Sequence, residues 1–136
     1  MILKGLEMVK GKTISQQVIS CAFEVSNRLG AGFLESVYEN ALCIELEQQG
    51  IDFQQQVPIS VEYKDQIVGI YVADLIVGNK ILVELKALSE FSRTHDAQVM
   101  NYLKATGIHV GLLLNFGTPK LGIRRIAWQY NEAEGI

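Results

Sequence analysis

The chain has 136 residues, of which 49% are hydrophobic and 20% charged, and this composition is typical of one soluble globular domain. The formal net charge is −3 at pH 7. That value argues against a protein that coats nucleic acid non-specifically, because such proteins are usually basic. No apolar run approaches the ~18 residues of a membrane span, and no signal-peptide pattern is present, so we expect no membrane partner.

Two helices are predicted in the first third of the chain. Residues 1–12 mix Lys, Glu and Gly and are predicted to form a loose leader. Thr13–Gln16 then has the form of a capping box, so a helix of about four turns is predicted to follow it and to end at Gly30. A second helix is predicted over 34–49. Its core-facing stripe is expected to be Leu34, Val37, Ala41, Leu42 and Ile44, with Leu46 as a further candidate.

The pattern changes to that of strands from residue 51 onward. Four strands are predicted in succession, at 52–57, 59–64, 67–77 and 80–87. Pro58 is expected to end the first of them, and the fourth, which is the most apolar, is expected at the centre of the sheet. A helix and two more strands are predicted after them, at 93–105, 108–115 and 123–129. The resulting order, ααββββαββ, predicts a single α/β domain over 13–130 with a C-terminal tail at 131–136.

The two cysteines, Cys21 and Cys43, both fall inside predicted helices. They lack the spacing of a CxxC pair or of a Cys/His metal site. We interpret them as buried, reduced thiols, and on that basis expect a cytoplasmic protein.

Three charged residues interrupt the apolar strands between residues 74 and 86. Asp74 is followed ten residues later by Glu84, and Lys86 shares a strand face with Glu84 because side chains alternate along a strand. Two carboxylates can bind Mg²⁺ or Mn²⁺, and a nearby lysine can orient an attacking water or offset developing charge. The spacing alone is a weak signal, and a solvated strand edge or a local ion pair is the alternative interpretation.

The turn between the two strands decides whether Asp74 and Glu84 can share a site. A two-residue loop at Gly78-Asn79 would place Asp74 opposite Val83, and the two carboxylates would then lie on opposite faces of the sheet. A three-residue loop that includes Lys80 places Asp74 across from Glu84 instead. We predict this odd-length turn or an equivalent bulge.

Several motifs occur in one order along the chain. They are Gly32-Phe-Leu-Glu35-Ser-Val-Tyr38, Gln56-Val-Pro58, Ala73-Asp74, Val83-Glu-Leu-Lys-Ala87, His95–Leu103 and Gly111–Gly117, with Arg124-Arg125 behind them. Together they make the sequence similar to the GxxExxY proteins, a family within the PD-(D/E)xK nuclease-like superfamily. The resemblance covers about residues 13 to 127. One departure is Ala73, which stands where the superfamily's nominal motif has a proline.

The resemblance implies a restriction-endonuclease-like fold, in which helices flank a mixed central sheet. It also implies that three carboxylates, those of Glu35, Asp74 and Glu84, bind Mg²⁺ or Mn²⁺. Lys86 would be the catalytic lysine. Gln98 and Tyr102 match a Gln-xxx-Tyr element and are expected to orient the site or to touch substrate. Taken singly, Glu35 has another interpretation as a helix N-terminal carboxylate favoured by the macrodipole.

These implications predict a Mg²⁺-dependent nuclease that hydrolyses phosphodiester bonds, with DNA favoured over RNA as its partner. The alternative is a non-catalytic module that keeps the fold and binds nucleic acid or protein. The intact acidic and lysine positions favour the enzyme, whereas the acidic pI and small size favour the module. A homodimer is also plausible, because a small acidic domain offers little surface for gripping a duplex.

Overall fold

A computed structural model describes residues 11–136 of the chain, so the predicted leader at 1–12 lies almost entirely outside the described residues. The elements of this part are the helices α2 (Ile14–Leu29), α3 (Glu35–Gln48) and α4 (Arg93–Thr106), the strands β1 (Phe53–Tyr63), β2 (Gln66–Val77), β3 (Ile81–Lys86), β4 (Val110–Asn115) and β5 (Gly122–Ala127), and a short 3₁₀ turn η1 (Glu132–Glu134). None of the helices in this part of the chain has the length and apolar character needed to cross a membrane.

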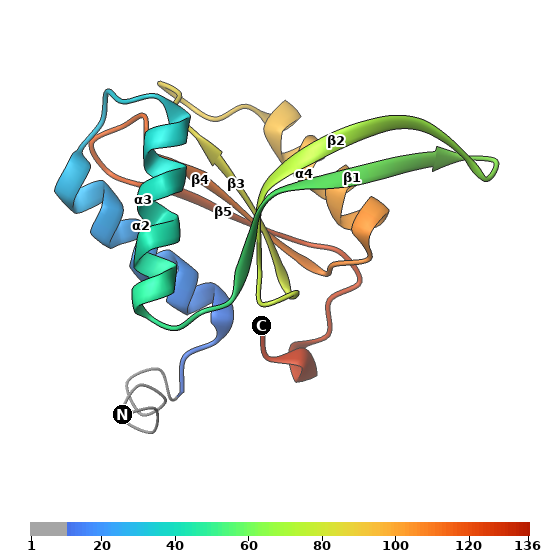
Figure 1. Cartoon of the computed structure of the whole chain (residues 1–136), viewed down its shortest axis with the longest axis horizontal. Helices are drawn as coiled ribbons and strands as arrows, with labels where there is room; N and C mark the ends of the chain where they lie inside the picture. The colour runs from blue at the N-terminus through green and yellow to red at the C-terminus, as the bar shows by residue number, and fades with distance from the viewer. Residues whose placement is uncertain (1–10) are drawn as a thin grey trace.

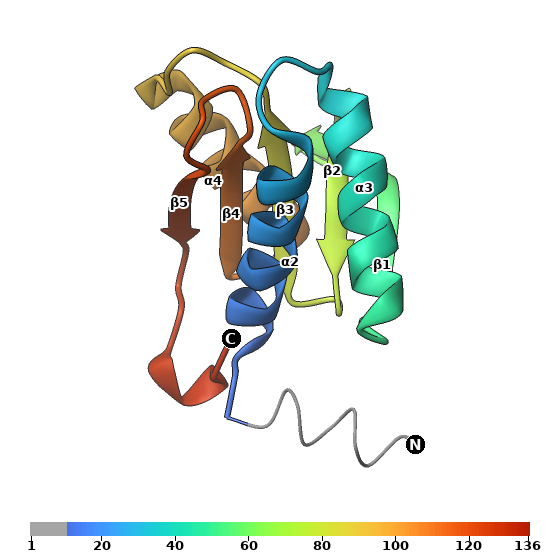
Figure 2. The same cartoon turned by 90° about the vertical axis from the view of Figure 1, so that its left-hand side faces the viewer.

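The strands form one sheet in the order β1-β2-β3-β4-β5, and helices cover both of its faces (Figures 1 and 2). β3 lies at the centre, as predicted. It pairs in parallel with β4, whereas the other neighbouring strands are antiparallel. Figure 2 shows α2 and α3 on one side of the sheet and α4, which connects β3 to β4, on the other. This mixed sheet with flanking helices confirms the predicted α/β fold class.

The predicted helix boundaries are confirmed to within about two residues. The Thr13 hydroxyl accepts a hydrogen bond from the backbone of Gln16, whose side chain in turn accepts from Thr13, and this capping box starts α2. Gly30 ends α2 with φ 69°. Gly107 ends α4 in the left-handed conformation, with φ 76°. Local sequence signals therefore determine where these helices begin and end.

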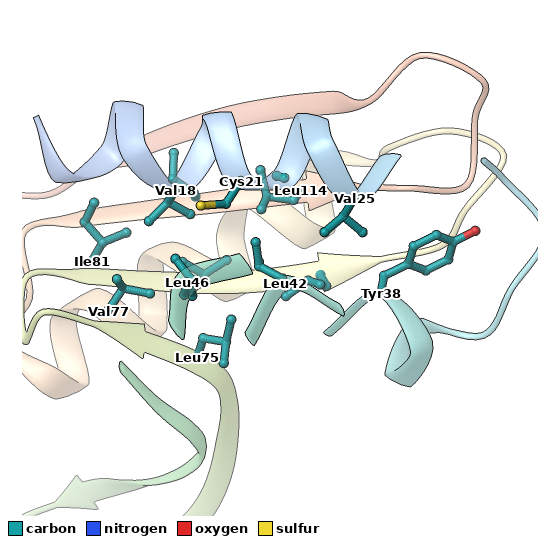
Figure 3. Packing of buried hydrophobic residues seen from close by; sticks show 14 of the residues in the cluster. Val18, Cys21, Val25, Tyr38, Leu42, Leu46, Leu75, Val77, Ile81 and Leu114 are labelled. Atoms are coloured by element: carbon teal, nitrogen blue, oxygen red, sulfur yellow. The ribbon is translucent and has the colours of Figure 1, made fainter. Parts of the chain in front are cut away.

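The predicted core stripe of α3 is wrong at three positions. Leu34 is 78% exposed and Ile44 is 55% exposed, and Val37 is exposed as well. The side chains that face the sheet are those of Tyr38, Leu42 and Leu46, all fully buried (Figure 3). They recur every four residues, as side chains on one helix face do. The helix carries a second apolar stripe that points to solvent, and the sequence pattern alone did not separate the two.

The larger core cluster lies between the sheet and the helices α2 and α3 (Figure 3). Val18 and Val25 of α2 pack there with Ile81 and Leu114 from the central strands. Both cysteines are buried in this cluster and free of disulfides. Burial raises the pKa of each thiol to about 11, and neighbouring glutamates add to the effect. The interpretation of Cys21 and Cys43 as buried thiols is confirmed.

Pro58 does not end a strand, which corrects the prediction of separate strands at 52–57 and 59–64. β1 runs continuously through Pro58, which pairs with Val72 of β2. β1 is the edge strand of the sheet. On its outer side a residue without an N–H loses no ladder hydrogen bond, and proline is therefore tolerated there. The element order has one strand fewer than predicted.

The segment predicted as a C-terminal tail, 131–136, packs against the domain. Ile136 is buried in the larger core cluster. The Arg125 guanidinium donates one hydrogen bond to Ser15 Oγ at 2.7 Å and another to the Ile136 carbonyl oxygen at 3.0 Å. This arginine therefore joins β5, the start of α2 and the last residue of the chain.

β1 and β2 extend well past β3 as a two-stranded arm, which Figure 1 shows reaching across α4 and beyond it. The arm begins at Gln56, a non-glycine residue with φ 54°, which lies across from Asp74 between the Gln55–Leu75 and Val57–Ala73 pairs. Leu75 packs in the cluster under α2 and α3, whereas Ala73 packs in the cluster under α4. The two strands therefore twist at Gln56 and Asp74. Beyond this point the face of the arm that carries Ala73 packs against α4.

Candidate active site

The turn between β2 and β3 has three residues, as predicted. Val77 pairs with Ile81, which leaves Gly78, Asn79 and Lys80 in the loop, and the Lys80 N–H donates to the Val77 carbonyl at 3.0 Å. Gly78 and Asn79 both adopt left-handed backbone conformations, with φ 59° and 55°. The backbone pairing ends at Leu75–Val83, and one step further in this register Asp74 faces Glu84, where side chain to backbone hydrogen bonds join the two strands. The predicted register is confirmed.

Asp74 and Glu84 are held together where β2 leaves β3. The backbone N–H of Asp74 donates to Glu84 Oε1 at 3.0 Å, and the backbone N–H of Leu85 donates to Asp74 Oδ2 at 2.8 Å. Each carboxylate thus takes a hydrogen bond from the other strand in place of a ladder bond. Because each side chain is bound to backbone, the two carboxylates are fixed in position before any ligand arrives.

The negative charge of the two carboxylates, Asp74 and Glu84, is only partly balanced by nearby positive charge. Glu84 is only 5% exposed. Its pKa is raised to about 8, chiefly by burial and secondly by the negative charge of Asp74, while Lys86 acts in the lowering direction. Lys86 lies two residues further along β3, half-buried. One lysine does not offset the cost of ionising both carboxylates, so the site would gain from a further cation.

A third carboxylate, which sequence reasoning missed, is buried and is joined to this pair through a glutamine. Glu39 of α3 is 7% exposed and accepts hydrogen bonds from Gln55 Nε2 at 2.6 Å and from Gln56 Nε2 at 2.9 and 3.0 Å. Gln56 Nε2 also lies 3.4 Å from Asp74 Oδ1. The left-handed kink at Gln56 therefore aims its amide between Glu39 and Asp74. The available sequence signal was a glutamate next to Tyr38, on the helix side that carries Leu42.

Glu35 is separate from this hydrogen-bonded cluster. Its side chain is exposed in the first turn of α3, one turn before Glu39. In residues 11–136 no hydrogen bond or ion pair joins Glu35 to Asp74 or Glu84, and no three His, Cys, Asp or Glu side chains are grouped so that they could hold a metal ion. The structure thus brings Asp74, Glu84 and Lys86 together without Glu35.

Tyr38, the tyrosine of the Gly-xx-Glu-xx-Tyr motif, is a packing residue. Its ring is fully buried and stacks on Phe116 with centroids 4.8 Å apart. Its hydroxyl donates to the Gly30 carbonyl at 2.6 Å and accepts from the Phe33 N–H at 3.1 Å. The tyrosine therefore fixes the loop between α2 and α3, and with it the start of the helix that carries Glu39.

Gln98 and Tyr102 lie one turn apart on α4, and the structure brings Tyr102 close to the carboxylates. Its ring is buried against the arm, with its centroid 5.6 Å from that of Tyr71. Burial raises the pKa of the Tyr102 hydroxyl, and the charges of Glu84 and Asp74 raise it further. Gln98 lines the same groove as Tyr102, between α4 and the arm. Both residues thus lie beside the site rather than in its carboxylate cluster.

Comparison with known proteins agrees with this geometry. The model of the PD-(D/E)XK nuclease superfamily matches residues 12–126. The fold is similar to that in the crystal structure of SSO0001, with a TM-score of 0.53 and 16% sequence identity over 73% of this chain. This chain spans about half of that protein, 52% of its length. No curated protein matches the sequence. On the strength of the family match, the chain belongs to the PD-(D/E)XK nuclease superfamily.

Proposed function

We propose that this chain is a metal-dependent nuclease that hydrolyses phosphodiester bonds in nucleic acid, with DNA favoured over RNA. One observation carries the proposal: Asp74 and Glu84 meet on adjoining strands, Glu84 accepting a hydrogen bond from the Asp74 backbone and Asp74 from the Leu85 backbone, with Lys86 two residues beyond Glu84. Membership of the nuclease superfamily supports it. Its narrower assignment to the GxxExxY proteins stays a prediction.

The residues of the site fit a hard divalent cation. The donors are carboxylate oxygens, which suit Mg²⁺ or Mn²⁺, with water completing the coordination. Burial and the charge of Asp74 raise the pKa of Glu84, and a cation held by the two carboxylates would offset both effects. Such an ion, when bound, lowers the pKa of a coordinated water and stabilises charge on the phosphodiester. Asp74 and Glu84 would hold it directly.

The other residues of the site have separate roles in this proposal. Lys86 orients the attacking water and offsets the negative charge that develops on the phosphate. Glu39 takes the place that sequence reasoning gave to Glu35, because it is the acidic side chain linked to Asp74 through Gln56. Gln98 and Tyr102 position the substrate from α4. In this proposal neither Lys86, Glu39, Gln98 nor Tyr102 forms or breaks a covalent bond itself.

A non-catalytic binding module is the second candidate. It is favoured by one observation, that residues 11–136 contain no ready-made group of three metal-binding side chains. In that case Asp74 and Glu84 would be a structural pair that fastens β2 to β3, and Glu84 would stay protonated near neutral pH.

Cleavage assays separate the two candidates. End-labelled single- and double-stranded DNA and RNA are incubated with Mg²⁺, Mn²⁺ or EDTA, beside the variants Asp74→Ala and Lys86→Ala. The nuclease predicts metal-dependent cleavage that both variants lose. Absence of cleavage in every condition by a folded wild-type protein would favour the binding module.

Two further parts of the proposal concern the protein's setting. We place it in the cytoplasm, because its two free cysteines are buried thiols of the kind that reducing compartments preserve. We also propose a homodimer, because the outer surface of the arm exposes apolar side chains such as Ile70, which is 64% exposed.

A further inference from the structure

A groove of about 1160 Å³ runs between α4 and the arm, and Gln98 and Tyr102 are among the residues that line it. It follows α4 from Thr94 to Ile108. Because α4 has 14 residues, the groove extends about 20 Å along the helix. Its volume exceeds the ~300–1,000 Å³ of a usual small-molecule pocket. Its shape suits an extended chain better than a compact ligand.

The lining of the groove mixes apolar and polar side chains in about equal measure and is nearly uncharged. Among the described residues that line it, Lys104 and Glu62 alone carry charge, and their signs cancel. The remaining polar groups are amides and hydroxyls, which both donate and accept hydrogen bonds. They come from Gln54, Ser60, Asn79, Thr94, Gln98, Asn101 and Thr106. A lining of this kind suits nucleobase edges, whereas a groove built for phosphates would be rich in Lys and Arg.

An aromatic pair stands in the groove where it approaches the carboxylates. Tyr71 of the arm is half-exposed, and its ring centroid lies 5.6 Å from that of the buried Tyr102. The two rings are tilted at 45° to each other, and the half-exposed Tyr71 ring offers surface for a ligand. Bases of a single strand stack on such rings irrespective of their identity. In a duplex the bases are paired and stacked on one another, so their faces are not offered to a groove.

We propose that this groove binds the unpaired bases of a single-stranded segment of the substrate, a few nucleotides from the bond that is cleaved. The inference rests on the proposed function for its substrate class, and goes beyond it by naming single strands and the surface that holds them. The bases lie against Tyr71, Asn101 and Gln98, while the backbone leads past Tyr102 to Asp74 and Glu84. The ~20 Å length holds about four nucleotides, the lower end of known single-strand sites.

Bulky substitutions in the groove test the proposal directly. Ala97 and Ala105 are exposed on α4 and line the groove, so Ala97→Trp and Ala105→Trp fill it without disturbing the core. Tyr71→Leu removes the stacking ring. Ala133→Trp, at an exposed alanine of η1 outside the groove, is the matched control. Circular dichroism and thermal unfolding check that each variant is folded.

Binding is measured by fluorescence anisotropy in EDTA, which prevents cleavage. The probes are a short labelled single strand of mixed sequence, made as DNA and as RNA, and the matching DNA duplex. We expect the wild-type protein to prefer the single strand. Ala97→Trp and Tyr71→Leu should weaken that binding about tenfold or more, in line with the loss of one stacked base, while Ala133→Trp leaves it unchanged.

The outcomes separate this inference from the proposed nuclease activity. If cleavage is metal-dependent but Ala97→Trp and Tyr71→Leu leave single-strand binding unaffected, the proposed role of the groove is wrong and the proposed nuclease activity is still supported. Single-strand binding that requires the open groove, without cleavage in any condition, would support the groove and overturn the nuclease. Equal affinity for duplex and single strand, or no measurable affinity for either, would also overturn the groove.

Discussion

One buried carboxylate, Glu84, contributes its own pH dependence to the stability of the metal-free protein. Its pKa is about 8 in the folded protein, against an ordinary 4.5, so the folded state keeps a proton that the unfolded state releases. The free energy of unfolding is therefore highest below pH 4.5 as far as this group is concerned, and falls as the pH rises from about 4.5 to 8. Other groups add their own pH dependence to this term.

We predict that urea unfolding in EDTA shows a loss of stability on the order of a few kcal/mol between pH 5 and 8, because each unit of pKa shift is worth about 1.4 kcal/mol. Glu84→Gln should flatten the curve, since an amide keeps the hydrogen bond from the Asp74 N–H without titrating. Glu90→Gln, at an exposed glutamate, is the control. A steep curve that persists in Glu84→Gln would show that another group is responsible.

A pair of glutamates one helical turn apart distinguishes the site seen in the structure from the one expected from sequence. Glu39 is buried and bonded to Gln56, whereas Glu35 is exposed. Glu39→Gln should lower metal-dependent cleavage about 10- to 100-fold, as changes in outer groups of metal sites do. Glu35→Gln should change the rate less than about twofold. If Glu35→Gln lowers the cleavage rate more than Glu39→Gln does in matched assays, Glu35 and not Glu39 is the third carboxylate of the site.

The same residues show why part of the site could be predicted. Asp74, Glu84 and Lys86 lie on two adjacent strands joined by a short turn, so counting the residues of the turn was enough to place them on one face. Glu39 depends on the rotational phase of α3 and on the conformation of Gln56, which has φ 54°. Neither property is encoded in spacing along the chain, because both follow from how α3 packs on the sheet.

At the scale of elements, the β2–β3 turn is the part of the fold on which the site most depends. Gly78 has φ 59°, and a Cβ placed there would lie 2.4 Å from Ile14 Cδ1. Gly78→Ala should therefore lower the free energy of unfolding by about 1–2 kcal/mol, mostly from the left-handed backbone, since the Ile14 side chain can move aside. Gly69→Ala is the comparison, because φ at Gly69 is outside the left-handed region and no atom lies within 4 Å of its added Cβ.

Urea unfolding of the two variants checks the prediction, and equal stabilities would contradict it.

Element boundaries such as Gly30 and Gly107 were predictable for the same local reason as this turn, because a glycine satisfies a backbone requirement at one point. The strand break predicted at Pro58 was wrong because the effect of a proline on a strand does not depend on local sequence alone. Whether a proline ends a strand depends on whether that strand lies at the sheet edge, and sequence spacing does not give this.

At the scale of the whole molecule, the arm stands out because many of the exposed large apolar side chains lie on it. Six of its large apolar side chains are 46–64% exposed: Tyr63, Ile67, Val68, Ile70, Tyr71 and Val72. They lie on both faces of the arm: Tyr71 lines the groove beside α4, whereas Val68, Ile70 and Val72 alternate along the opposite face. This second face is free to form a self-complementary contact with another copy of the chain.

We predict that the protein dimerises through the arm at micromolar concentration. Val68, Ile70 and Val72 alternate along one face of β2, so Ile70→Lys places a charge at the middle of this row and should shift the protein to monomer in sedimentation-velocity experiments. Ile44→Lys is the matched control, because Ile44 is 55% exposed on α3 and far from the arm in sequence. A dimer that survives Ile70→Lys but dissociates with Ile44→Lys would move the interface to the solvent-facing apolar stripe of α3.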